Sequence, residues 1–201
     1  MIGVILRELE VFRMRFRFAF LCLCKYRRNQ HLEKNMRVTR FFEIPLAKES
    51  IDLYRWVTEM TDADYTSYAQ GHKAMGSYFK DGCFCMANVE MIGNEMIVQS
   101  YVLREHRPDR VKFYSERTKA YIFRWFPAVV GVPWEMSLRQ KGSDRCELVC
   151  TIGADFPNLI VALGAYINGL GGLFLRRHLK EEGEAFARDI ERKFRTIPAQ
   201  D

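Results

Sequence analysis

The segment from Asn158 to Arg195 places the strongest constraint on the fold. Its first part, 158–175, is almost wholly apolar and contains four glycines, and its second part, 176–195, reads as a charged amphipathic helix. One stripe of this helix collects Leu175, Leu179, Gly183, Phe186, Ile190 and Phe194. Gly183 costs about 1 kcal/mol relative to alanine in a helix, so its place on the stripe indicates close approach to a neighbouring layer. The segment therefore predicts a C-terminal helix that covers a sheet and closes a cavity.

The opposite side of this helix is predicted to face solvent. Two pairs of opposite charge, Glu184 with Arg188 and Asp189 with Lys193, have the i,i+4 spacing that places them next to each other on a helix surface. A membrane span over 159–175 is disfavoured, because the run is short and holds Asn168 and the glycines.

Alternating strands precede this segment. They are expected at 37–44, 83–91, 95–104, 110–117, 121–126, 133–140 and 145–154, with turns at Gly93 and at Pro108. In 83–91 one face of the strand is predicted to be apolar and buried, and it carries Cys83, Cys85, Ala87, Val89 and Met91. Asn88 and Glu90 belong to the opposite face. Six or seven antiparallel strands with one apolar face predict a strongly curved sheet that needs a covering helix, which is an α+β fold.

Two short helices are expected between the first strand and the rest. The first covers 48–60, where the apolar residues have roughly helical spacing. Thr61 and Asp64 form a T-x-x-D capping box that opens a second helix toward Gln70. These helices would span the open end of the sheet.

The charge of the chain is concentrated in its first 35 residues. The chain has 201 residues, 48% of them hydrophobic, which suits one domain, and its formal charge is +6. Residues 1–35 hold eight Lys/Arg against three acids, so 36–201 carries only +1. A nearly neutral body offers no basic face for phosphates, which argues against a nucleic-acid partner.

The segment 1–35 is interpreted as a basic, aromatic extension of a domain at 36–201. Phenylalanines alternate with arginines over 12–18, and the uninterrupted apolar run 18–24 is too short to cross a bilayer. Lys25 and Arg27 follow that run instead of the small residues of a secretory cleavage site. Two interpretations of this segment are open: it contacts an anionic membrane peripherally, or it is not part of the fold. Either Met1 or Met36 is the true start.

The order of strand, two short helices, antiparallel strands and long C-terminal helix resembles the helix-grip fold of the SRPBCC superfamily. The likeness rests on this order, on VTRFFEIP at 38–45 and on GLGGLFLRRHLKEEGEAFARDI at 169–190. This superfamily includes START lipid-transfer domains, polyketide cyclases and aromatases, and plant ligand carriers. The resemblance implies an apolar cavity between sheet and helix and implies no particular catalytic residue. The basic extension is a departure from it.

Chemical motifs are sparse. His72, between the short helices and the sheet, is a weak candidate for a general acid or base, while His178 is read as lying among solvated charges. Cys83, Cys85, Cys146 and Cys150 lack finger-type spacing and are read as buried thiols, which fits a reducing, cytoplasmic compartment. We therefore expect no metal and no cofactor.

Parity and position predict the residues that face the cavity. Those expected to contact an apolar ligand are Phe113, Trp134, Met136, Leu148, Tyr166, Leu170 and Phe174, with His72 and Tyr101 as polar handles. The predicted function is binding of a lipid, fatty acid or polyketide-like molecule, as a carrier or sensor. The alternative is a cyclase, aromatase or dehydratase that uses the same cavity for acid-base chemistry.

Overall fold

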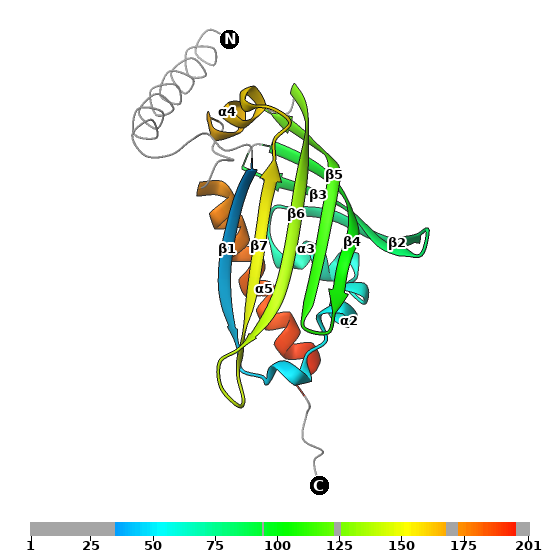
Figure 1. Ribbon diagram of the computed structural model, residues 1–201, viewed down its shortest axis with the longest axis vertical. Coiled ribbons are helices and arrows are strands. Elements are labelled where there is room, and N and C mark those ends of the chain that lie inside the picture. Colours follow the sequence, from blue (N-terminus) through cyan, green and yellow to red (C-terminus); the bar gives the residue numbers. More distant parts are fainter. Residues whose placement is uncertain (1–34, 94, 123–125, 168–172, 196–201) are drawn as a thin grey trace.

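A computed structural model describes residues 35–93, 95–122, 126–167 and 173–195 (Figure 1). Its strands are β1 (Asn35–Ile44), β2 (His72–Lys80), β3 (Cys83–Ile92), β4 (Glu95–Arg107), β5 (Arg110–Ile122), β6 (Phe126–Gln140) and β7 (Cys146–Asp155). Its helices are the short 3-10 helix η1 (Lys48–Ser50), α2 (Leu53–Thr58), α3 (Asp62–Tyr68), α4 (Leu159–Ile167) and α5 (Leu173–Phe194). The basic extension 1–34, including the expected membrane contact, lies outside the described residues.

The strands form one antiparallel sheet in the order β1-β7-β6-β5-β4-β3-β2. The sheet curves around α5, which runs behind β1 and β7, while α2 and α3 lie behind β4 and β5 and α4 lies at the opposite end (Figure 1). The predicted curved sheet with a covering C-terminal helix is confirmed. The capping box at Thr61 and Asp64 is also present and begins α3.

The apolar stripe of α5 is buried as predicted, and Gly183 explains how closely the helix approaches the sheet. A Cβ atom at this position would lie 2.1 Å from Cε2 of Phe42, on the inner face of β1. Real Cβ atoms do not approach other atoms so closely, so only glycine fits without movement of the ring. The helix axis is therefore drawn toward β1 at this point.

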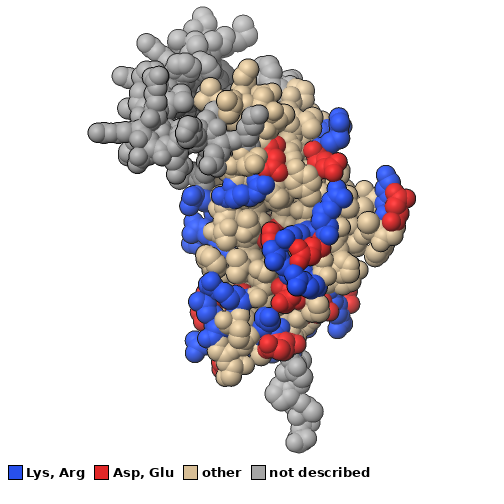
Figure 2. Space-filling model, in the orientation of Figure 1, with Lys and Arg blue, Asp and Glu red and all other residues tan. Residues whose placement is uncertain are grey.

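The outer face of the sheet carries charges of both signs. Figure 2 shows Lys and Arg interleaved with Asp and Glu over this face. Glu105 illustrates the pattern, since it pairs with Arg107 at 2.6 Å and with Lys112 at 2.9 Å. The face shown offers no extended basic patch, in agreement with the near-neutral charge of the body. No helix among the described residues combines the length and the apolarity that crossing a membrane requires.

Some elements differ from those predicted. Strand β2 was missed because it lies at the sheet edge, where most of its side chains are exposed and no alternation of apolar residues is needed. The expected helix over 48–60 is instead η1 followed by the shorter α2. Strand β6 also covers 127–132, the stretch between the strands predicted at 121–126 and 133–140. Among the described residues, Pro127 pairs with β5 and has no partner in β7, so it occupies a free edge that tolerates proline.

The inner face of β3 was predicted incorrectly. Phe84, Met86, Asn88, Glu90 and Ile92 are the buried set, whereas Ala87, Val89 and Met91 are only half-buried. The buried face was predicted to be the one with more apolar residues. The true inner face carries two buried polar residues, Asn88 and Glu90, so hydrophobicity indicated the wrong side. Cys83, at the start of the strand, is exposed, so the prediction of a buried thiol is wrong there. Cys85, Cys146 and Cys150 are buried free thiols, as predicted for these three.

Candidate functional site

The aromatic residues expected to contact a ligand instead fill the space between the sheet and α5. Phe113 and Trp134 stack with ring centroids 5.2 Å apart, and Tyr101 lies 5.8 Å from Trp134. Trp134 in turn lies 5.9 Å from Phe186 of α5. Met136 and Leu148 are fully buried in the same core. The interior at the middle of α5 is therefore packed.

Two further expected residues, Tyr166 and Phe174, belong to α4 and to the first turn of α5. Phe174 is 44% exposed, and a Cβ atom added at Gly93 would lie 3.6 Å from its ring, so it covers the turn between β3 and β4. Leu170 lies outside the described residues, as does the side chain of Tyr166. None of the described residues that were predicted to contact a ligand lines the apolar cavity between the sheet and helices α4 and α5.

That cavity lies between the sheet and the two C-terminal helices and has a volume of about 60 Å³. Residues of β1 and of β3 to β7 form one wall, and Val161, Ala165 and Leu175 of α4 and α5 form the other. The lining is apolar apart from Gln99 and Thr118. A typical small-molecule site measures about 300–1,000 Å³, so this space holds a small group and must widen for anything larger.

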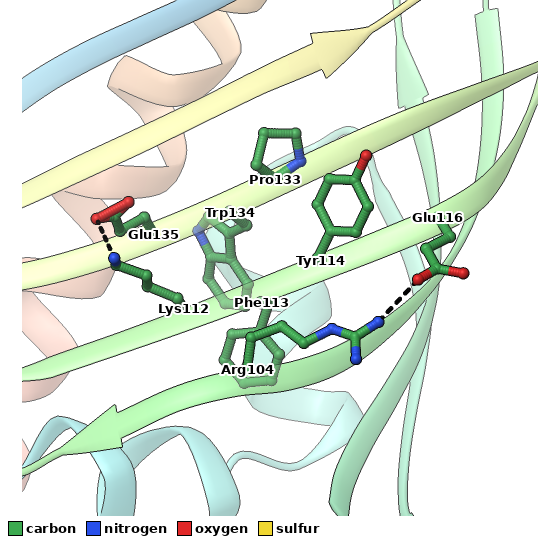
Figure 3. Close-up of a pocket in the computed structure, with 8 residues that line it drawn as sticks. All are labelled: Arg104, Lys112, Phe113, Tyr114, Glu116, Pro133, Trp134 and Glu135. Carbon is green, nitrogen blue, oxygen red and sulfur yellow. Dashed lines mark hydrogen bonds and ion pairs between the residues drawn. The ribbon is translucent and has the colours of Figure 1, made fainter. Parts of the chain in front are cut away.

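A second hollow, of about 570 Å³, lies on the outer face of the sheet (Figure 3). It is open to solvent and bordered by charged side chains that pair with one another, Arg104 with Glu116 at 2.9 Å and Lys112 with Glu135 at 3.7 Å. An open, charge-paired depression does not suit an apolar ligand. The smaller apolar cavity is the better candidate.

A buried polar cluster is the most unusual feature of the interior. It consists of His72 on β2, Glu90 on β3, and His178 and Glu182 one turn apart on α5. The side chains are between 0% and 7% exposed. Nε2 of His72 lies 3.5 Å from Oε1 of Glu182, and Nε2 of His178 lies 3.5 Å from Oε2 of Glu90. Four ionisable groups thus share one water-excluded site, which we call the His-Glu cluster.

Tyr65 and Asn88 hold this cluster in place. The Tyr65 hydroxyl donates to Oε1 of Glu90, and Nδ2 of Asn88 donates to the same oxygen at 2.8 Å. Nδ1 of His72 lies 2.7 Å from the backbone carbonyl of Tyr65, and the two rings stack 4.0 Å apart. The capping box that begins α3 therefore also places Tyr65 against the cluster.

The environment shifts the pKa of each member. Burial raises the pKa of Glu182, and the nearby Glu90 carboxylate adds to this effect. Burial alone would lower the pKa of His178, but Glu90 and Glu182 raise it to about 9. Burial lowers the pKa of His72. Burial alone would raise the pKa of Glu90, but the two histidines outweigh this effect and lower it. Groups with such shifts are frequent at functional sites.

Sequence reasoning found only part of this site. His72 was singled out, but His178 is buried rather than solvated, which corrects that prediction. Glu90 was missed because its strand parity was misread, and Glu182 because it borders the apolar stripe of α5. The i,i+4 spacing of His178 and Glu182 was the signal that could have revealed the site.

A second buried polar site surrounds Asp189 of α5, which is only 7% exposed, so the prediction that it faces solvent is wrong. Its Oδ2 accepts hydrogen bonds from Trp56 Nε1 at 2.8 Å and from the Tyr68 hydroxyl at 2.7 Å, and Lys193 pairs with it at 3.1 Å. These contacts outweigh burial and lower the pKa of Asp189 to about 2. The site links α2, α3 and α5.

Comparison with solved structures identifies the fold. A protein from Thermus thermophilus matches with a TM-score of 0.56 at 12% identity over 79% of this chain and 98% of its own. The Zhui aromatase/cyclase from Streptomyces sp. R1128 matches with a TM-score of 0.55 at 8% identity over 80% of this chain and 94% of its own. The chain has the same helix-grip fold as these two structures.

Other comparisons with solved structures are weaker. A START superfamily protein from Mycobacterium smegmatis matches with a TM-score of 0.47 at 13% identity, over 79% of this chain and 99% of its own. No protein-family model and no curated protein matches the sequence. The resemblance predicted from element order is confirmed at the level of the fold.

Proposed function

We propose that the protein binds an apolar small molecule between the sheet and helices α4 and α5, as a carrier or sensor. The apolar cavity at this place carries the proposal. Affinity would come from burial of apolar surface, at about 25 cal/mol per Å². Gln99 and Thr118 supply the polar groups that would orient the molecule.

Binding of a lipid, fatty acid or polyketide-like molecule requires the cavity to widen. Helix α4 is the element that would move, because it lies at the end of the sheet and its Leu159 and Ile160 are 47% and 83% exposed. A helix that buries so little of its apolar surface loses little when it shifts. Hydrogen exchange in α4 is therefore expected to change when ligand binds.

The test is whether an apolar molecule accompanies the purified protein. Native mass spectrometry followed by organic extraction should find one stoichiometric apolar molecule, or a fluorescent fatty acid should bind with saturation. Ala165→Leu, which fills the cavity from α4, should weaken binding at least tenfold. Ala63→Leu, at an exposed position of α3, is the matched control. An empty protein that binds no member of a panel of fatty acids and polyphenols would refute the proposal.

The His-Glu cluster favours a second candidate, an enzyme of the cyclase, aromatase or dehydratase kind. Its histidines and carboxylates have the shifted pKa values that acid-base catalysis uses. None of its four members lines the apolar cavity, however, so a substrate would reach them only if the cavity widens toward the cluster. His72→Ala separates the candidates, since a carrier should keep most of its affinity whereas an enzyme should lose turnover.

Residues 1–35 and the compartment remain predictions. We infer that the protein is cytoplasmic and that its basic, aromatic extension contacts anionic membranes peripherally. Binding to phosphatidylserine vesicles by the chain with and without 1–35 tests this. Equal binding by both forms would exclude a role for the extension.

A further inference from the structure

The His-Glu cluster has the composition and spacing of a metal centre. One ligand atom from each of His72, Glu90, His178 and Glu182 can be chosen so that all four lie within 4.8 Å of one another. Zinc binds imidazole nitrogen and carboxylate oxygen at about 2.0–2.2 Å, which places neighbouring tetrahedral ligands about 3.3–3.6 Å apart. The two histidine–glutamate separations of 3.5 Å match this spacing.

Four buried side-chain atoms of the cluster make no hydrogen bond of normal geometry to any described residue. These are Nε2 of His72, Oε2 of Glu90, Nε2 of His178 and Oε2 of Glu182. The charged contacts within the cluster, His178 with Glu90 and His72 with Oε1 of Glu182, are 3.5 Å long. All four atoms belong to side chains that are more than nine-tenths buried. A buried polar atom without a hydrogen bond destabilises the fold, and a charged group does so more strongly. A single bound cation would satisfy all four atoms at once.

The tautomer of His72 supports this reading. Its Nδ1 lies 2.7 Å from the Tyr65 carbonyl oxygen, which can only accept, so the hydrogen belongs to Nδ1. In neutral His72 the Nε2 lone pair then points toward the Glu182 carboxylate. A histidine whose far nitrogen is held by a backbone carbonyl is the usual arrangement of a metal ligand.

Glu90 is also held as a metal ligand usually is. One carboxylate oxygen accepts from Tyr65 and Asn88, which leaves the other directed at the cluster. Outer partners of this kind orient the ligand and raise metal affinity. Tyr65 therefore supports two ligands, Glu90 through its hydroxyl and His72 through its carbonyl.

We propose that His72, Glu90, His178 and Glu182 bind one divalent first-row transition-metal ion, with zinc as the simplest case. Two imidazoles and two carboxylates suit zinc or ferrous iron better than calcium or magnesium, which prefer all-oxygen sites. Four protein ligands in a buried position fill a tetrahedral shell and leave no open place for substrate, so the site is structural. The ion would tie the edge strand β2 and its neighbour β3 to α5.

The test uses full-length protein and zinc alone. Cys22 and Cys24 in the extension could bind zinc by themselves, so the reference protein carries Cys22→Ser and Cys24→Ser. After chelation and dialysis, this protein should take up one equivalent of zinc, measured by elemental analysis, and its melting temperature should rise. Cobalt in place of zinc should give the intense visible absorption of a tetrahedral site.

Variants locate the site. His178→Gln and Glu182→Gln should each weaken zinc binding at least tenfold, and Tyr65→Phe should weaken it about 10- to 100-fold through loss of the outer partner. His106→Gln and Glu184→Gln, at positions outside the cluster, are matched controls that should bind like the reference. Circular dichroism of each metal-free variant identifies any that fails to fold.

Two results would overturn the proposal. One is a folded reference protein that takes up less than a tenth of an equivalent of zinc and of cobalt and keeps its melting temperature when zinc is added. The other is stoichiometric zinc that binds equally to folded His178→Gln or Glu182→Gln protein. If neither ligand variant folds, the reference protein decides through its zinc content and its cobalt spectrum. Fatty-acid binding is measured separately on metal-free protein, so this outcome is independent of the proposed ligand function.

Discussion

Gly183→Ala is expected to destabilise the protein, although the same change stabilises most helices. Alanine is favoured over glycine by about 1 kcal/mol inside a helix. Here the new methyl group would lie 2.1 Å and 2.3 Å from two ring carbons of Phe42. Relief requires the ring or the helix to move, and such overpacking costs about 1–3 kcal/mol. We expect a net loss of about 1 kcal/mol.

Urea unfolding followed by circular dichroism measures this free energy. Gly164→Ala in α4 is the matched control, because no described residue lies within 4 Å of its added Cβ, and it should gain up to about 1 kcal/mol. Phe42→Leu removes the two closest ring atoms and should rescue Gly183→Ala, with a coupling energy of about 1 kcal/mol in a double-mutant cycle. Equal stabilisation by Gly183→Ala and Gly164→Ala would refute the close approach of α5 to β1.

Three further predictions concern stability and reactivity. The pKa of Asp189 is lowered from 3.8 to about 2 in the folded protein, so its stabilising contribution is complete above pH 3.8 and disappears as the pH falls through about 2. Asp189→Asn should therefore flatten the acid-induced loss of stability in that range, and an unchanged acid profile would contradict the assignment. Thr61→Ala removes the side-chain cap of α3 and should lower the free energy of unfolding by about 1 kcal/mol, whereas a Thr66→Ala control should change it less. An alkylating reagent should label exposed Cys83 in native protein and buried Cys150 only after unfolding, because burial raises the pKa of the Cys150 thiol. Peptide mapping that finds both cysteines labelled at equal rates in native protein would disprove this.

The parts of the fold that were predictable from sequence follow from simple periodicity. In β7 every second residue from Cys146 to Ile152 is buried, and Trp134, Met136 and Leu138 of β6 alternate in the same way. On these strands the buried residues are apolar and most of the intervening ones polar, so a period of two identifies the inner face. The buried stripe of α5 was equally clear at a period of 3.6.

Periodicity fails where a strand has two similar faces or hardly any buried face. Strand β3 presents Ala87, Val89 and Met91 on one parity and Asn88 and Glu90 on the other, so hydrophobicity points to the wrong side. Burial of Glu90 is tolerated only because it has a partner on another element, and that partner, His178, lies 88 positions away in the sequence. The alternation within β3 alone therefore does not reveal this contact.

Helix α5 shows how the polar sites could have been inferred. Beside its apolar stripe runs a second line of His178, Glu182 and Asp189, spaced by four and seven residues and buried along the same helix. A helix needs only one apolar stripe to cover a sheet, so ionisable residues that recur at helical spacing along its border must meet partners on the elements it covers. Trp56, Tyr68, His72 and Glu90 are those partners, and they come from α2, α3, β2 and β3. The helix therefore packs on the sheet through its apolar stripe, and through the polar line it contacts the short helices, the edge strand β2 and its neighbour β3.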